Sequence, residues 1–188
     1  MNLDDKFQIR DGLYTYPSIN DNNSNRSDLN QKIKQELLEN IEIGNIEKCQ
    51  KLLQSLKCFD EELLTQACKK GLTTLVELFI QKFPTDFTNT CKDLVFDLCY
   101  EGQEEIALLL IKAGASLDGE KKIQGQANGT ESTLSLLHVA CFKNLPKIVQ
   151  QLIQHLKDLE IQTEKGLTPL HFACTAGHLS IVQLLNVS

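Results

Sequence analysis

Two short stretches near the C-terminal end of the sequence place a histidine three residues before a cysteine. They read "LHVAC", with His138 and Cys141, and "LHFAC", with His171 and Cys174. A histidine that accepts the proton of a thiol makes the sulfur a nucleophile, so this spacing allows a catalytic pair. Thiolates and imidazoles also bind zinc, so a metal site is the second chemistry to consider.

The surroundings of these stretches recur along the chain. Each copy is followed three residues after its cysteine position by a glycine or an asparagine, the anchor of the copy: Gly44, Gly71, Gly102, Asn144 and Gly177. The anchors are separated by 27, 31, 42 and 33 residues. One unit is therefore present five times, with connections of different length between the copies.

Apolar residues stand at fixed distances on both sides of each anchor. Seven residues before it lie Leu37, Leu64, Val95, Leu137 and Leu170. Eight residues after it lie Leu52, Phe79, Leu110, Leu152 and Leu185. Together with apolar positions at spacings of three and four, these columns predict two short amphipathic helices per unit. Glycine and asparagine at the anchor predict a left-handed residue that ends the first helix.

The starts of the first helices carry a second signal. Nine residues before the last three anchors stand Asp93, Ser135 and Thr168, all of which are good N-cap residues. Pro169 then suits the first helical position, where no N–H group is needed. Glu62, at the same place in the second unit, is a poor cap and leaves that boundary open.

The stacking of such units opposes a shared metal site or a disulfide at the cysteines. Four units share a cysteine three residues before the anchor: Cys68, Cys99, Cys141 and Cys174. Equivalent positions in stacked helices lie about 8–10 Å apart, whereas zinc needs each sulfur at about 2.3 Å and a disulfide needs Cα atoms closer than about 7 Å. We therefore expect a small apolar residue packed between helices, with no metal and no cofactor.

The sequence resembles the ankyrin-repeat family. The segment "TPLHFACTAGH" at 168–178 is similar to the family's T-P-L-H-x-A signature, and "SLLHVAC" is a weaker copy. The first three units are degenerate, and the resemblance covers about residues 29–186. It implies an all-α solenoid of about five stacked helix-turn-helix units with hairpin loops. It also implies that His171 and His138 are structural, each ring tying a helix start to neighbouring loops.

Composition narrows the function classes. The net charge of −6 argues against nucleic-acid binding, and no apolar run reaches the ~20 residues of a membrane span. The segment "MNLDDKFQIRDG" is no secretory signal, and seven cysteines without a CxxC pair predict reduced thiols in the cytoplasm. The Asn-, Gln- and Lys-rich composition would also suit a protist or an intracellular bacterium whose protein acts inside a host cell.

The predicted organisation is a flexible polar segment at 1–28 followed by a repeat domain at 29–188. The repeats are expected at about 29–57, 58–88, 89–117, 131–161 and 164–188, with an inserted loop at 118–130. The last unit ends near "IVQLLNVS", so Leu170, Ile181 and Leu185 would lack a following unit to cover them. We expect a fragment of a longer protein, or self-association through this uncapped repeat.

The resemblance implies a protein-protein interaction module and no enzyme. Phosphate-binding, HExxH and GxSxG motifs are missing from the sequence. The resemblance implies that partner contacts come from the hairpin tips and from variable positions of the inner helices, which line a concave groove: Gln66, Lys69, Lys70, Asp97, Tyr100, Glu101, Val139, Phe142, Lys143, Phe172 and Thr175. Tyr100, Phe142 and Phe172 stand out, because aromatic side chains dominate interface energetics; packing of the two phenylalanines on a neighbouring hairpin stays open. Alternatives are the targeting or regulatory segment of a larger enzyme or channel, and an enzyme that uses Cys141 or Cys174 with a nearby histidine.

Overall fold

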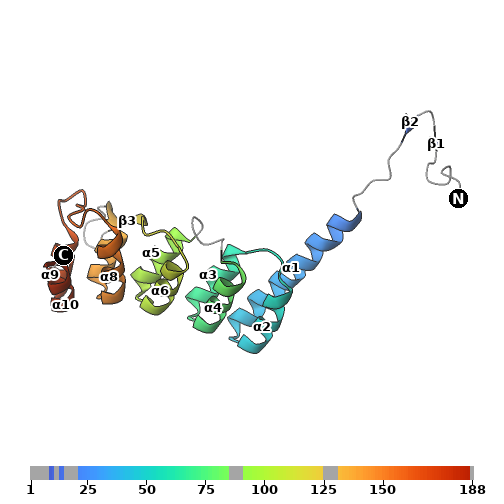
Figure 1. The fold of residues 1–188 in the computed structure, drawn as a ribbon, viewed down its shortest axis with the longest axis horizontal. Coiled ribbons are helices and arrows are strands. Elements are labelled where there is room, and N and C mark those ends of the chain that lie inside the picture. The colour runs from blue at the N-terminus through green and yellow to red at the C-terminus, as the bar shows by residue number, and fades with distance from the viewer. Residues whose placement is uncertain (1–8, 11–12, 15–20, 85–90, 125–130, 187–188) are drawn as a thin grey trace.

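A computed structural model shows a curved row of helix pairs (Figure 1). The structure describes residues 9–10, 13–14, 21–84, 91–124 and 131–186. The helices of this part of the chain are α1 (Asp21–Glu42), α2 (Ile46–Ser55), α3 (Glu61–Lys69), α4 (Thr73–Lys82), α5 (Lys92–Glu101), α6 (Glu104–Lys112), α7 (Leu136–Phe142), α8 (Pro146–His155), α9 (Pro169–Ala176) and α10 (Leu179–Asn186). The expected all-α repeat fold is confirmed.

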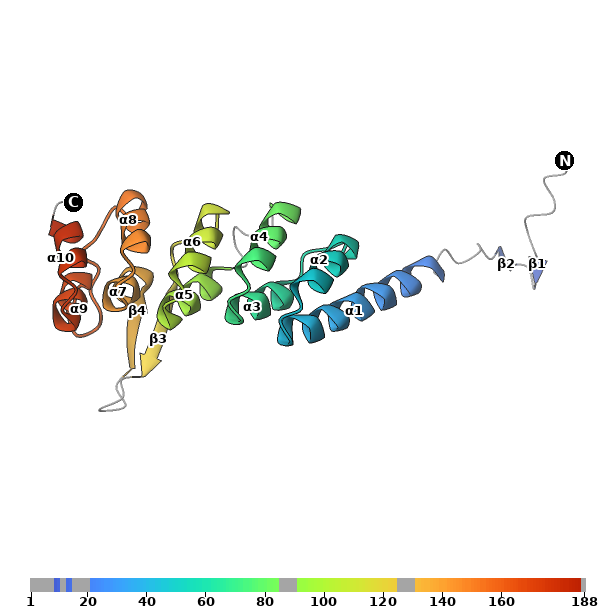
Figure 2. The same cartoon turned by 90° about the horizontal axis from the view of Figure 1, so that it is seen from below.

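Each helix packs on its counterpart in the next pair. The odd-numbered helices contact one another in sequence order, and the even-numbered helices form a second row beside them (Figure 2). The first row, from α1 to α9, is called the inner row below. Side chains that lie far apart in the sequence are therefore brought to one face at regular intervals.

The anchor residues have the backbone conformation that the sequence predicts. Asn144 has φ 58°, and it is the non-glycine residue with positive φ in the described chain. Gly177, at the same place in the next unit, has φ 76° and is the C-cap of α9. A residue with a Cβ is strained in this region, and asparagine tolerates it better than most because its side chain bonds locally.

The helix starts agree with the predicted caps in the last two units only. Ser135 is the N-cap of α7 and Thr168 the N-cap of α9, as predicted. The prediction for Asp93 is wrong: Cys91 is the N-cap of α5, and Asp93 lies in its first turn. An acidic side chain there still interacts favourably with the helix dipole, so the residue type fits either place.

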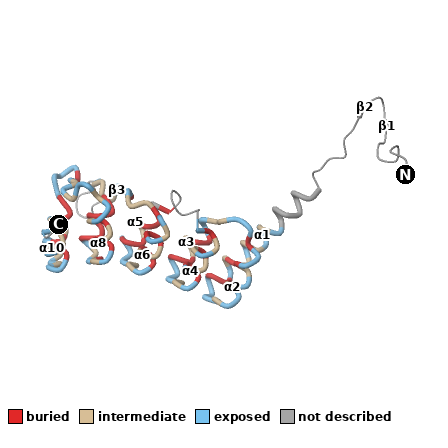
Figure 3. The backbone as a smooth tube through the Cα atoms, viewed as in Figure 1, coloured by how far each residue is buried: buried red, intermediate tan, exposed pale blue. Residues whose placement is uncertain are grey.

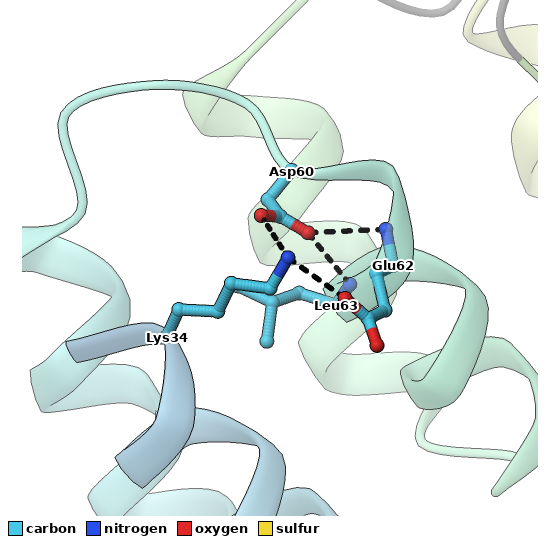
Figure 4. A network of polar contacts seen from close by, with 4 residues as sticks. All are labelled: Lys34, Asp60, Glu62 and Leu63. Atoms are coloured by element: carbon cyan, nitrogen blue, oxygen red, sulfur yellow. Dashed lines mark hydrogen bonds and ion pairs between the residues drawn. The ribbon is translucent and has the colours of Figure 1, made fainter. Parts of the chain in front are cut away.

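The open boundary in the second unit is settled by a polar network (Figure 4). Asp60 is the N-cap of α3, and its Oδ1 accepts hydrogen bonds from the backbone N–H groups of Glu62 and Leu63 at 3.1 and 3.2 Å. Lys34 reaches across from α1 and places its Nζ 2.7 Å from both the Asp60 and the Glu62 carboxylates. The hydrogen bond to Asp60 raises the pKa of Lys34. Such partly exposed pairs stabilise by about 0–1 kcal/mol each, so this network mainly sets the register of the first two units.

The apolar columns form the core between neighbouring units. Leu37, Leu64, Val95 and Leu137 are each 0% exposed. Figure 3 shows buried stretches alternating with exposed ones along the helices. In the last unit Ile181 is buried, whereas its neighbours are half-buried: Leu170, Val182, Leu184 and Leu185. Self-association through this face stays a prediction.

The insertion before the fourth unit contains a β-hairpin. Strands β3 (Glu120–Gln124) and β4 (Glu131–Ser135) pair antiparallel, with Glu120 opposite Ser135 and Gln124 opposite Glu131. The hairpin projects from the side of the inner row (Figure 2). Its expected tip, within the inserted loop 118–130, lies at 125–130, outside the described residues.

The expected flexible segment at 1–28 is only partly described. Residues 1–8, 11–12 and 15–20 lie outside the described part of the chain, and the two-residue strands β1 (Ile9–Arg10) and β2 (Leu13–Tyr14) pair with each other. Helix α1 begins at Asp21, before the expected boundary at residue 29. A helix whose C-terminal half is packed can extend into a polar segment, because propagation is easier than nucleation.

The hairpin is fastened on both sides by charged side chains. Lys121 on β3 forms an ion pair with Asp97 on α5, with 2.5 Å between Nζ and Oδ1. On β4, Thr133 donates from its backbone N–H to Glu164, at 2.9 Å from Oε2, and from its hydroxyl, at 2.6 Å from Oε1. The bond from the hydroxyl is the main cause that lowers the pKa of Glu164 to about 2.

We expect the Glu164→Gln substitution to lower the midpoint of thermal unfolding near neutral pH. The folded-state pKa lies below the ordinary value of 4.5, so the ionised carboxylate stabilises the fold above about pH 4.5 and loses this effect as the pH falls toward 2. The difference between wild type and variant should therefore shrink over that window in melts followed by circular dichroism. Glu160→Gln, in the same connection, is the control. If both substitutions lower the unfolding midpoint equally, the hydrogen bonds between Thr133 and Glu164 do not stabilise the fold as proposed.

Candidate functional site

The first histidine of the sequence motif is fully engaged in the scaffold. His138 is 1% exposed, and its Nδ1 accepts a hydrogen bond from the backbone N–H of Ser135 at 3.2 Å. Nδ1 is then the unprotonated nitrogen, so Nε2–H donates to the carbonyl of Leu167 at 3.1 Å. Burial is the main cause that lowers the pKa of His138. The ring thus caps α7 and ties it to the connection before α9, and neither nitrogen is left to act on a substrate.

The second histidine repeats only the first half of this arrangement. Thr168 donates from its backbone N–H to Nδ1 of His171 at 3.1 Å, and its hydroxyl lies 2.8 Å from the same nitrogen. His171 is exposed, and the described residues give its Nε2 no partner. The two histidines therefore form a matched pair, one with the bridge to a neighbouring loop and one without it.

The cysteine column is buried in three of its four members. Burial raises the pKa of Cys68, Cys99 and Cys141 to about 12 each. At neutral pH these sulfurs are thiols, which neither attack nor bind metal as thiolates do. Cys174 is exposed, and all seven cysteines are free. Within the described ranges no group of three or more His, Cys, Asp or Glu side chains is placed to hold a metal ion.

Four of the expected partner contacts meet on the inner row. The ammonium group of Lys143 lies 4.6 Å from the ring centroid of Tyr100 and 5.9 Å from that of Phe142. The ring of Phe142 meets that of Phe172 edge to face, with centroids 6.3 Å apart. Helices α5, α7 and α9 each supply part of this group, which we call the aromatic row: Tyr100, Phe142, Lys143 and Phe172. Tyr100 is 43% exposed and Phe142 47%.

The charged and polar candidates are mostly bound to neighbours. Asp97 pairs with Lys121 of the hairpin, and Lys70 lies 2.6 Å from the Glu42 carboxylate. Glu101 accepts a hydrogen bond from Gln103 at 3.3 Å.

The remaining polar candidates lie toward the two ends of the inner row. Thr175 donates to the carbonyl of His171 at 2.7 Å. Gln66 is half-buried and Lys69 is exposed, both on α3. These three side chains take no part in the contacts of the aromatic row. Together with Lys70, Asp97 and Glu101 they are called the polar margin below.

Val139 has to be removed from the expected partner contacts. It is 1% exposed, because α7 is packed by α5 on one side and by α9 on the other. Phe172 occupies the equivalent position in the next unit and is half-buried. Helix α9, in contrast, contacts α7 on one side, and the described residues place no further inner helix on its other side.

One supporting residue was missed by the sequence analysis. The Nε2 of His178 lies 3.0 Å from the carbonyl of Phe142, so the turn after α9 is tied to the end of α7. The ring of His138 packs edge to face against the ring of Phe172, with the two centroids 5.2 Å apart. Only the position of His178 directly after the anchor Gly177 could have marked it as a turn contact.

A separate hollow lies on the other row of helices. Its volume is about 460 Å³, and its walls come from α2 and α4. Lys82 crosses it and donates to the carbonyls of Leu53 and Gln54 at 2.6 and 2.7 Å. The lysine thereby satisfies the C-terminal end of α2, which gives this hollow a structural explanation.

We expect His138→Ala to destabilise the fold more than His171→Ala. The first substitution leaves the Ser135 N–H and the Leu167 carbonyl without their partner and should cost about 1–3 kcal/mol in the free energy of unfolding. The second removes a cap bond only and should cost about 0.5–1.5 kcal/mol. Urea unfolding of both variants measures the difference, and equal losses would contradict the bridge to Leu167.

Thiol labelling provides a test of the cysteine column. A maleimide added to the folded protein near neutral pH should modify Cys58 and Cys174, which are exposed, and leave Cys68, Cys99 and Cys141 unmodified. Mass spectrometry after proteolysis identifies the labelled positions, and labelling in urea supplies the control for complete reaction. Rapid labelling of Cys141 in the folded state would contradict its burial.

The comparisons with known proteins agree with the architecture. A family model described as ankyrin repeats (3 copies) matches residues 119–186, and no curated protein matches the chain. Ankyrin repeats are generally protein-interaction modules and typically non-catalytic. In the part of the chain that the structure describes, no helix is long and apolar enough to cross a membrane. The stacked helix pairs and this match together show that residues 119–186 contain ankyrin repeats.

Proposed function

We propose that the chain binds a partner protein through the aromatic row. The observation that carries this proposal is that three successive inner helices each contribute an aromatic ring to one contiguous group. Tyr100 and Phe142 are among the exposed large hydrophobic side chains of the described residues. Aromatic side chains that become buried on association supply most of the binding energy of typical interfaces.

Contacts within the fold position the aromatic row before any partner binds. His178 fixes the backbone at Phe142, and the ring of His138 supports Phe172. Lys143 joins Tyr100 to Phe142 across two units. Side chains that are already ordered lose little conformational entropy on binding, so more of the contact energy remains as affinity.

The polar margin completes the proposed interface. Lys69, Lys70 and Gln66 lie on the side of the second unit, and Thr175 lies on the last inner helix. Asp97 and Glu101 flank Tyr100 on α5. A polar rim around an apolar centre is the usual anatomy of an interface between proteins that also exist separately.

A reducing compartment such as the cytoplasm suits the proposed module. Seven free cysteines are compatible with it, because free thiols persist where disulfides are kept reduced. Cys68, Cys99 and Cys141 are buried between the units, so their oxidation would disturb the scaffold that carries the aromatic row.

The proposal predicts that Tyr100→Ala and Phe142→Ala each weaken partner binding. Partners are first captured from a lysate with the wild-type protein and identified, and the affinity of the purified partner is then measured by calorimetry. Each substitution should lower the affinity by a factor of about 10–100, equivalent to roughly 1.4–2.8 kcal/mol.

Ile43→Ala is the matched control, since Ile43 is 74% exposed at the turn between α1 and α2, away from the row. It should leave the affinity unchanged. Thermal melts check that all three variants are folded. A partner that binds the Tyr100 and Phe142 variants as tightly as wild type would overturn the proposed surface.

A further inference from the structure

We infer that the partner presents a carboxylate to Lys143, next to an apolar side chain that packs on the rings of Tyr100 and Phe142. This inference rests on the proposed function and specifies the chemistry of its partner. It depends on one asymmetry in the inner row, the difference between Lys143 and the other lysines that reach this face.

Lys143 is the exception among the interacting lysines of the inner face. Lys34, Lys70 and Lys121 each have a carboxylate within 2.7 Å of the ammonium group. Lys143 has no carboxylate partner among the described residues, and its contacts are with two ring faces. In a chain whose net charge is −6, a half-buried cation that the fold leaves without an acid is an open position for one.

The position of the ammonium group favours an external acid. The ammonium group lies 4.6 Å from the ring centroid of Tyr100 and 5.9 Å from that of Phe142, so it is close to two exposed aromatic side chains. Glu101, an acid of α5, directly follows Tyr100 and accepts a hydrogen bond from Gln103. A ring face attracts a cation without neutralising it, so a carboxylate can add to the existing contacts without displacing them.

Docking strengthens this preference. A partner that covers Tyr100 and Phe142 removes water from the ammonium group between them, and an ion that loses water without gaining a counter-ion opposes binding. A carboxylate from the partner supplies the counter-ion and fixes the register of the complex. A lysine or arginine at the same place would be repelled, so the site discriminates by charge as well as by fit.

The predicted ligand is therefore a peptide segment with an aspartate or glutamate beside an aromatic or aliphatic residue. Lys69 on α3 is exposed and extends the preference for acidic segments toward the second unit. The short distance between Lys143 and the rings requires the acid and the apolar residue to be close together in the ligand.

Selection of random peptides displayed on phage tests the inference. Peptides enriched on the wild-type protein should pair an acidic with an apolar residue, and a Lys143→Glu variant should enrich lysine or arginine at the acidic place. Lys157→Glu, at an exposed position in the connection after α8, carries the same charge change and should select the wild-type peptides.

A double-mutant cycle then measures the pair itself. For one selected synthetic peptide, replacement of its acid by the matching amide should lower the affinity about tenfold on the wild-type protein and have little effect on Lys143→Gln. Fluorescence anisotropy gives the four affinities. Enriched peptides that lack an acidic residue would overturn the inference. So would a change from acid to amide that lowers the affinity equally for wild type and for Lys143→Gln.

The same experiment separates this inference from the proposed function. Peptides that bind wild type, lose affinity for Tyr100→Ala and keep the same affinity for Lys143→Gln would support the aromatic row as the binding surface. They would exclude a carboxylate partner for Lys143. If no enriched peptide loses affinity for the Tyr100→Ala variant, the aromatic row is not the binding surface. That result overturns both the proposed function and the inference.

Discussion

A single helix pair of this protein cannot cover its own apolar faces, and this constraint shapes the rest of the structure. Leu64, Val95 and Leu137 occupy the same place in successive units and are each 0% exposed, because the neighbouring unit covers them. Each fully buried apolar side chain stabilises the fold by roughly 1.5–3 kcal/mol. The apolar interfaces between units, called the seams, therefore stabilise the fold more than any single polar contact does. Hydrogen bonds and ion pairs then fix the spacing that this burial requires.

The histidine and cysteine side chains, which could act in catalysis elsewhere, here help to maintain that spacing. His138 gives one nitrogen to the start of α7 and the other to the carbonyl of Leu167, so it ties two units together. Cys99 and Cys141 fill small gaps between helices, and burial raises the pKa of each thiol to about 12. The same histidine-cysteine spacing in an open cleft would suggest catalysis. For His138 and Cys141, burial lowers the pKa of the imidazole and raises the pKa of the thiol, which disfavours the charged forms that catalysis needs.

Regular stacking also explains how an interaction surface arises from unrelated residues. Tyr100 and Phe142 each stand two residues before an anchor and Phe172 stands five residues before one, and the helices that carry them, α5, α7 and α9, lie side by side. Lys143 then connects two rings at distances that neither unit could set alone. Variation at such positions changes the surface without disturbing the seams, because the apolar columns point to the neighbouring units.

The sequence by itself determined the features that depend on local backbone preference. The positive φ of Asn144 and the caps Ser135 and Thr168 could be predicted because each rests on residues only a few positions away. Tertiary structure decided what depends on the neighbouring unit. Val139 is buried and Phe142 exposed although both were expected on the surface, and His138 bridges two units whereas His171 does not. Asp60, which the sequence analysis did not consider, caps α3 and meets Lys34 from α1. The physical reason is that burial and pairing are set by whatever packs against a residue, and that neighbour is remote in the sequence.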